Sequence, residues 1–523
     1  MTYFDNRLIL FLIPALVIAY QIAPKKLRPL GLLAFSYLLF FYVSRKLIVF
    51  IIASSLTIYL YGWYTIWNEK RLNKELNEEN KKEVKAKYQK KNKRMMLLVL
   101  LINIAFLFVF KYLRFFTTNA NIILDWFNAG HHLKIFRFAA PIGISFYTLQ
   151  ALSYVIDVYN KKQEPSKNII KVFLYLAFFP TVMEGPITRF SEVADDLMKG
   201  ERVYFKSFCF GYQRIIWGFF KKLVIADRLN IIVEHVFNNY SHYGSLSMVI
   251  GTIAYTILLY AEFSGTMDVV IGIGEIFNVK IPENFKQPFF SKNISDFWTR
   301  WHISLGKWFK DYIFYPVSLS KPMKKLNSSI RQHLKNRTGP LVTGGIALFC
   351  VWSLNGLWHG AGWTFIFYGM YHFVCILLGN IFEPWIVKLC GLLHIKRESK
   401  PYIVFRIVKT WFFIFLGELF FRAPSMSVAF GMLGNMLSFK GMFPHELLRY
   451  GLDGKDYIVL FISIIVLFVV GVLREKNINI REKIAEKPIY VRWLIYYLLI
   501  FSVILFGAYG SEYIPVDPIY ADF

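Results

Sequence analysis

The stretch YIVLFISIIVLFVVGVL at residues 457–473 is seventeen residues long and carries no charge. A helix of this length and composition is a candidate to cross the hydrocarbon core of a bilayer, which is roughly 30 Å thick. Comparable apolar runs recur along the chain, at about residues 7–23, 30–43, 47–67, 95–113, 137–158, 170–187, 207–226, 246–264, 340–355, 363–387, 403–421 and 491–509. The fold class that this pattern predicts is an all-α polytopic membrane protein.

The composition of the whole chain supports that prediction. Of its 523 residues 56% are hydrophobic and only 18% are charged, against roughly 25% charged in a soluble globular domain. The runs 30–43, 170–187 and 340–355 are too short or too polar for plain spans. We therefore expect about eleven transmembrane helices plus re-entrant or interfacial pieces, in a single integral membrane domain over residues 1–523.

The net charge of +27 arises from 61 Lys and Arg against 34 Asp and Glu. These cations cluster in short loops between apolar runs, which favours a positive-inside membrane topology and no nucleic-acid partner. The most hydrophilic segment, residues 68–94, is predicted to be a charged cytoplasmic helical arm, and residues 321–337 a second cytoplasmic basic loop. The four cysteines are scattered without a C-x-x-C pair, so we expect neither a disulfide framework nor a metal site.

Polar groups inside apolar segments are costly and are therefore the first candidates for function. In the first such stretch, Glu262 and Asp268 flank Ser264–Gly265. A helix end or kink at the Ser-Gly pair would aim both carboxylates at one cavity. The alternative is that both are buried structural acceptors that pair with Arg or Lys.

The second stretch, residues 296–312, has the spacing of one amphipathic helix lying at the membrane interface. Asp296 and Arg300 are one turn apart, and Trp301 belongs to an apolar stripe. Trp298 and His302 would share a face of this helix. His302 is a candidate functional residue, with a satisfied structural histidine as the alternative.

The third stretch runs from Asn355 to Trp363. Gly356 and Gly360 form a small-xxx-small step that permits close backbone approach. Asn355 lies one turn before His359, near enough to set the tautomer of its imidazole. A neutral imidazole can take a proton from an alcohol, although a buried histidine can also be structural.

Several reaction classes lose support from the sequence. We find no G-x-S-x-G, no complete G-x-x-x-x-G-K-[ST], no G-x-G-x-x-G and no H-E-x-x-H. Acid–base chemistry by one or two intramembrane histidines remains, with no bound cofactor, no metal and no covalent enzyme intermediate.

Several ordered blocks, taken together, resemble the membrane-bound O-acyltransferase (MBOAT) superfamily, in particular its bacterial alginate O-acetylation (AlgI-like) branch. The blocks are Pro141 to Gln150, Phe178 to Ile187, Phe220 to Arg228, Glu262 to Asp268, Ile281 to Phe285, Phe297 to Tyr312, Leu357 to Gly360 and Phe420 to Pro424. The resemblance implies helices arranged around a central tunnel. It also implies a catalytic role for His359 and a second essential position at His302.

The resemblance further implies an acyl thioester donor, acetyl-CoA or an acyl carrier protein, that reaches the tunnel from the cytoplasm. Its setting would be the bacterial plasma (inner) membrane, with membrane lipids around it and a secreted or membrane-anchored, SGNH-like acetyltransferase as partner. The side chains expected to bind substrate are Asn355, Trp301, Trp358, Ser264 and Asp268.

The chain also departs from the alginate-type pattern. Members of that branch usually show Asp-Phe-Ser-Gly-Tyr-Ser-Asp where this chain has Glu262, Thr266 and Met267, and residues 514–523 match the family's aromatic tail only loosely. The acceptor polymer is therefore open among alginate, cellulose and other exopolysaccharides. D-alanylation of teichoic acid through a carrier protein is an alternative, and a transporter or channel is a remote one.

Overall fold

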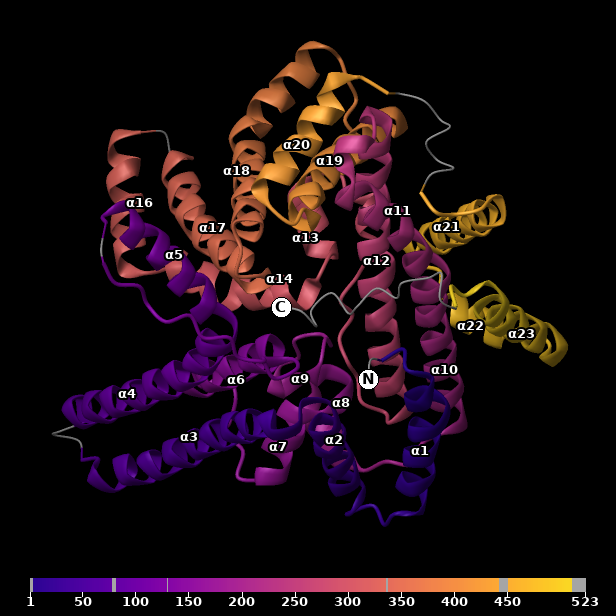
Figure 1. Ribbon diagram of the computed structural model, residues 1–523. Coiled ribbons are helices and arrows are strands. Elements are labelled where there is room, and N and C mark those ends of the chain that lie inside the picture. Colours follow the sequence, from indigo (N-terminus) through magenta and orange to yellow (C-terminus); the bar gives the residue numbers. More distant parts are fainter. Residues whose placement is uncertain (1–2, 78–80, 129, 335–336, 442–449, 510–523) are drawn as a thin grey trace. The chain divides into compact units, whose positions relative to one another are not determined.

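The computed structural model describes residues 3–77, 81–128, 130–334, 337–441 and 450–509. Helices and connecting segments make up this part of the chain, which contains no strand (Figure 1). The predicted all-α class is confirmed. The C-terminal tail at 514–523, residues 78–80 of the predicted arm and residues 335–336 of the second basic loop lie outside the described residues.

The chain forms two compact units, the first made of residues 1–212 and 270–282 and the second of residues 213–269 and 283–523. The helices of the first unit are η1 (Leu8–Leu12), α1 (Ile13–Ile22), α2 (Arg28–Ser44), η2 (Arg45–Leu47), α3 (Ile48–Glu75), α4 (Lys81–Leu107), η3 (Phe108–Tyr112), α5 (Leu113–Trp126), α6 (Ile144–Tyr159), α7 (Ile169–Ala177), α8 (Phe179–Val182) and α9 (Phe190–Lys199). The helices α10 (Phe205–Phe219) and α12 (Ser245–Ile276) contribute residues to both units. That the chain is one domain stays a prediction.

The second unit contains the remaining helices. They are η4 (Phe220–Ala226), α11 (Asp227–Asn238), η5 (Tyr240–His242), η6 (Pro288–Phe290), α13 (Ile294–Arg300), α14 (Ile303–Phe309), η7 (Lys310–Phe314), α15 (Tyr315–Ser318), α16 (Lys321–His333), α17 (Thr338–His359), α18 (Trp363–Leu392), α19 (Lys400–Arg422), α20 (Met426–Ser438), α21 (Gly454–Glu475), α22 (Ile480–Ala485) and α23 (Ile489–Phe506).

Seven helical stretches in the described part are long and apolar enough to cross a membrane. They are residues 28–75, 81–126, 245–276, 338–359, 363–392, 454–475 and 489–506. Shorter apolar helices accompany them, so the chain is a multi-pass membrane protein, while the total of about eleven spans stays a prediction. The expectation that run 340–355 is too short for a span is wrong, because α17 extends it at both ends to 22 residues.

The polar arm and the interrupted run 170–187 behave as their composition suggests. α3 and α4 pack side by side (Figure 1). The charged residues 68–94 comprise the end of α3 and the first part of α4. There Glu75 accepts hydrogen bonds from Lys87 at 3.2 Å and from Tyr88 at 2.6 Å. The run 170–187 divides into α7 and α8, whose short lengths exclude a plain span.

Candidate active site

The long helix α12 carries the first polar stretch without interruption. It is helical throughout Ser245–Ile276, so the predicted helix end at Ser264–Gly265 is wrong. Gly265 serves a different purpose, because a Cβ there would lie 2.9 Å from the carbonyl oxygen of Gly218 in α10. A Cβ on Gly218 would in turn lie 2.6 Å from the Gly265 oxygen. The pair of glycines therefore permits two helices to touch along their backbones.

Asp268 belongs to a buried network of charges. Its carboxylate lies 2.9 Å from Nε of Arg214 and 2.6 Å from Nζ of Lys221. Arg214 also forms two hydrogen bonds, of 2.8 and 2.6 Å, with the carboxylate of Glu283. Lys221 donates a further hydrogen bond of 2.8 Å to the hydroxyl of Ser264. These contacts match the alternative in which Asp268 is paired with Arg and Lys, and its role in substrate binding, like that of Ser264, stays a prediction.

The two carboxylates of this stretch do not lie on one face of the helix. Glu262 and Asp268 are six residues apart, which is about 240° around an unbroken α-helix. Both side chains are buried. The two side chains therefore project in different directions from a continuous helix, against the expectation that both point into one cavity.

The second polar stretch is two short helices rather than one. α13 ends at Arg300, α14 begins at Ile303, and His302 between them has φ 46° and ψ 53°, in the left-handed region. This conformation is uncommon for a residue other than glycine and is enriched at functional sites. The pair Asp296–Arg300 forms as predicted, at 2.9 Å.

Trp301 of the predicted apolar stripe is buried, as a residue of such a stripe should be. The expectation of one continuous interfacial helix is wrong. Because the helix breaks before His302, Trp298 and His302 do not share a face. The Trp298 indole contacts His372 at 4.9 Å, whereas the imidazole of His302 contacts Phe263 at 4.9 Å.

Asn284 holds the break in place. Its side-chain oxygen accepts hydrogen bonds of 2.9 Å from the backbone nitrogen and from the hydroxyl of Ser304. Its backbone oxygen accepts from Ile303 N at 3.0 Å, and its amide nitrogen donates to the sulfur of Met267 at 3.2 Å. Four contacts from one residue fix the turn that presents His302.

The same Asn284 oxygen lies 3.4 Å from Nδ1 of His302. Since a carbonyl oxygen can only accept, this contact assigns the proton to Nδ1 and the basic lone pair to Nε2. His302 is 2% exposed and lies outside the seven candidate spans. Burial lowers the pKa of His302 to about 3, so its imidazole is neutral at physiological pH.

The third polar stretch brings the two candidate histidines next to one indole ring. His359 is the last residue of α17 and is 4% exposed. Its ring lies 5.2 Å from that of Trp358, and the Trp358 ring lies 5.7 Å from that of His302. The Trp358 ring therefore contacts two buried imidazoles that are 57 positions apart in the sequence.

Asn355 is also buried near this end of α17. Its side-chain oxygen has no hydrogen-bond partner in the described part of the chain, so it does not hold the His359 ring as expected. A buried polar oxygen without a partner is costly and can be satisfied by a bound substrate. The predicted close approach at Gly356 is confirmed, because a Cβ there would lie 2.5 Å from the carbonyl oxygen of Phe365 in α18.

The sequence reasoning missed a buried acid next to His359. Glu418 of α19 is 1% exposed and accepts a hydrogen bond of 3.0 Å from the hydroxyl of Tyr368 in α18. The Tyr368 ring stands edge-on to His359, with centroids 6.0 Å apart, and Phe421 covers another side at 5.2 Å. A lone carboxylate inside the apolar run 403–421 was the signal that could have identified Glu418.

His372 is a third buried histidine close to these residues. Trp298 Nε1 donates to its Nδ1 at 3.4 Å, which places the ring proton on Nε2. Its ring lies 4.6 Å from that of Tyr368. Nε2 of His372 has no hydrogen-bond partner among the described residues.

Trp301 lies away from this cluster of side chains. Its indole packs against Phe285 at 5.0 Å, Phe297 at 5.4 Å and Tyr260 at 6.1 Å. The structure thus brings together His302, Trp358 and His359, places Ser264 and Asp268 in the ion network, and gives Trp301 packing contacts. Within the described ranges, no group of three or more His, Cys, Asp or Glu side chains could hold a metal ion.

The sequence of this chain is similar to those of known proteins. The model of the membrane-bound O-acyltransferase family matches residues 38–334, a range that includes His302 and ends before His359. The probable alginate O-acetylase AlgI of Pseudomonas syringae pv. tomato is 33% identical, over 75% of this chain and 70% of that protein.

Two further relatives act on other polymers, according to their names. The peptidoglycan O-acetyltransferase of Helicobacter pylori is 29% identical, over 66% of this chain and 65% of the relative. The teichoic acid D-alanyltransferase of Bacillus subtilis is 31% identical, over 53% of this chain and 69% of the relative.

Proposed function

The chain belongs to the membrane-bound O-acyltransferase family and is an acyltransferase, and from that premise we propose that it passes an acetyl group across the membrane for the O-acetylation of an exported polysaccharide. The donor is a cytoplasmic thioester, acetyl-CoA or an acyl carrier protein. The polymer is alginate, cellulose or another exopolysaccharide of a bacterial cell, and the chain lies in the plasma membrane. The observation that carries this proposal is that two buried histidines, His302 and His359, both contact the ring of Trp358.

The reaction needs one base and one stabiliser of negative charge. His359 takes the proton of the acceptor hydroxyl as that oxygen attacks the thioester carbonyl. The carbonyl carbon becomes tetrahedral and its oxygen becomes an anion, which the Asn355 amide stabilises by donating a hydrogen bond. When the intermediate collapses, the carbon–sulfur bond breaks and the proton passes from His359 to the departing thiolate. An ester and a free thiol result, so His359 returns to its neutral state.

His302 has a different task in this scheme. Its proton is held on Nδ1 by Asn284 and its Nε2 is basic, so it accepts a hydrogen bond rather than donating one at that nitrogen. We assign it to orienting the acceptor hydroxyl. Trp358 contacts both rings, which keeps the group that orients the acceptor near the group that takes its proton.

The role of Asn355 has a direct test. Asn355→Asp keeps the size of the side chain but replaces its donating NH2 group with a carboxylate that repels an oxyanion. Removal of one such donor typically costs 10²–10³-fold in turnover. Full transfer activity of Asn355→Asp at the normal amount of protein would show that Asn355 is not the donor.

The immediate acceptor is expected to be a partner protein. A secreted or membrane-anchored acetyltransferase of the SGNH type would receive the acetyl group at the far side of the membrane and esterify the polymer. Supporting this, the reacting side chains are buried in a multi-pass protein.

D-alanyl transfer to teichoic acid is the second candidate function, supported by the relative from Bacillus subtilis. The two are separated by hydrolysing purified surface polymers of the source cells with mild base and identifying what is released. Cells that lack the chain should lose ester-bound acetate if our proposal is correct. Loss of D-alanine instead would establish the second candidate, and loss of neither would reject both.

A further inference from the structure

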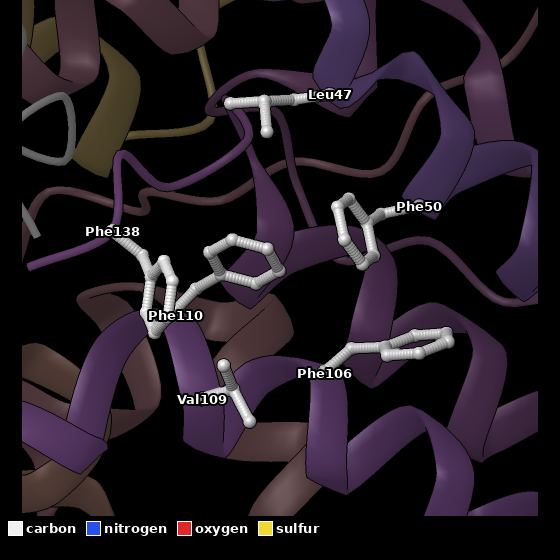
Figure 2. Close-up of a pocket in the computed structure, with 6 residues that line it drawn as sticks. All are labelled: Leu47, Phe50, Phe106, Val109, Phe110 and Phe138. Atoms are coloured by element: carbon white, nitrogen blue, oxygen red, sulfur yellow. The ribbon is translucent and has the colours of Figure 1, made fainter. Parts of the chain in front are cut away.

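An apolar pocket of about 420 Å³ lies in the first unit, far in sequence from the histidines. All of its lining residues are hydrophobic, and Figure 2 shows their side chains gathered around it: Leu47, Phe50, Phe106, Val109, Phe110 and Phe138. The lining comes from η2 and the start of α3, from the end of α4 with η3, and from the non-helical segment 130–141.

Aromatic side chains form the walls of the pocket, and part of the lining is exposed. Phe50 contacts Phe106 and Phe110 at 5.4 and 4.6 Å, and Phe110 contacts Phe138 at 6.1 Å. Phe138 is nevertheless 49% exposed and Val109 is 38% exposed. Apolar walls that stay open next to two candidate membrane spans suit a lipid acyl chain, which gains dispersion contacts there.

The pocket residues lie at the start of α3 and the end of α4, which is the opposite end of the helix pair from the charged arm at residues 68–94. The two helices run antiparallel because only residues 76–80 join them. From Ile48 to Glu75, a helix of 28 residues measures roughly 42 Å at 1.5 Å per residue. If the 68–94 arm is cytoplasmic, the pocket therefore faces the other leaflet.

Cations surround this end of the helix pair. Arg45 and Lys46 directly precede the pocket residue Leu47, and Arg137 directly precedes Phe138. All three are exposed, and so is Lys134. The positive-inside rule explains cations on the side of the arm but not these. The nearby acid Asp125 lies 3.3 Å from Nε2 of His132.

The segment that supplies Phe138 has the character of an interfacial strap. Residues 131–140 are non-helical and exposed throughout, and they mix Leu133, Ile135 and aromatic residues with Lys134 and Arg137. Lys134 Nζ lies 5.3 Å above the ring of Phe136, which stacks on Phe138 at 5.9 Å. Apolar and basic side chains side by side suit the boundary between headgroups and acyl chains.

We propose that this pocket binds an anionic phospholipid, with one acyl chain between Phe50, Val109 and Phe138 and the headgroup phosphate held by Lys46 and Arg137. The pocket accounts for the acyl chain, and the exposed cations beside Leu47 and Phe138 account for the charge. This site is independent of the acyl-transfer function, because none of its residues belongs to the histidine cluster.

The test is native mass spectrometry of the delipidated full chain, titrated with phosphatidylglycerol or with phosphatidylcholine of the same acyl chains. We expect phosphatidylglycerol to bind more tightly. Each Lys or Arg near a membrane surface adds about 1 kcal/mol of attraction to anionic lipid, which is roughly fivefold in affinity. The double variant Lys46→Gln/Arg137→Gln should therefore weaken phosphatidylglycerol binding by roughly 25-fold and leave phosphatidylcholine binding unchanged.

Two controls separate this site from general membrane attraction. Lys85→Gln/Lys90→Gln removes the same charge from exposed positions of the arm and should bind phosphatidylglycerol like the wild type. Val109→Phe fills the pocket and should weaken both lipids, whereas Leu101→Phe, at an exposed position of the same helix outside the pocket, should weaken neither. Equal binding of the two lipids by the wild type, or equal losses in the two charge variants, would overturn the proposal. So would unchanged lipid binding by Val109→Phe.

Discussion

Substitution of Asp268 distinguishes a structural role of this buried carboxylate from a functional one. Asp268→Ala would leave the ammonium of Lys221, whose side chain is 3% exposed, with only the Ser264 hydroxyl as partner. Arg214 would keep its two hydrogen bonds to Glu283. The cost therefore falls on Lys221.

Removal of one partner of a buried ion pair costs about 3–5 kcal/mol. We expect the low end, about 3 kcal/mol, because the Ser264 hydroxyl remains. The second unit contains roughly 300 residues, and unfolding entropy is about 2.1 cal/mol/K per residue. Dividing the free-energy loss by the unfolding entropy of this unit gives a fall of roughly 5 °C in the midpoint of thermal unfolding.

The assay is thermal unfolding of the purified chain in detergent, followed by tryptophan fluorescence. Glu283→Gln is the matched control: it removes the other acid of the network, but the Glu283 side chain is 59% exposed, so the loss should stay below about 1 kcal/mol. Asp268→Leu/Lys221→Met replaces the pair with apolar side chains and should recover stability close to that of the wild type. Acyl transfer by this double variant reports whether Asp268 also binds substrate. An Asp268→Ala midpoint within about 1 °C of the wild type would refute the ion-pair account.

Three further outcomes follow from the site. Because burial lowers the pKa of His302 to about 3, its imidazole is neutral at every pH well above 3. His302→Gln should therefore lower transfer by about 10²-fold and leave the shape of the pH–rate profile between pH 5 and 9 like that of the wild type. A changed profile would contradict a neutral His302. Glu418→Gln keeps an acceptor for the Tyr368 hydroxyl and should retain most transfer activity. Glu418→Ala removes the 3.0 Å hydrogen bond from that buried hydroxyl and should cost about 1–3 kcal/mol of stability, as thermal unfolding would show. Equal behaviour of the two variants would argue against the hydrogen bond. Gly265→Val forces side-chain atoms against the Gly218 oxygen and should greatly reduce the yield of monodisperse protein on size exclusion, and a normal yield would mean that α10 and α12 do not touch there.

The membrane class could be predicted from the sequence because hydropathy is a local property. Each apolar run is visible in its own residues, and α12, α18 and α21 follow runs that the sequence shows. The positions of the helix breaks were harder to predict from the sequence. Ser264–Gly265 has the composition of a break, but its glycine lies against Gly218, 47 positions earlier, and no local pattern reveals that contact.

At His302 the reverse holds: the local sequence predicts a continuous helix, and the fold interrupts it. Residues 296–312 have helical spacing, yet four contacts from Asn284 impose a turn that the local sequence does not favour. His359 and His302 were identified as candidates through motifs, and the contact of both with Trp358 required the fold. Glu418 could have been found as a lone acid in an apolar run, but its partner Tyr368 is 50 positions away.

The central claim is that His359 performs acyl transfer, and it is tested most directly by the ester content of the surface polymers. Cells that express His359→Ala would be compared with cells that express His394→Ala at the same protein level, since His394 is exposed and outside the site. Base-released acetate should fall more than 100-fold in His359→Ala and stay at the wild-type amount in His394→Ala. Unchanged ester content in His359→Ala would contradict the assignment of His359 as the base.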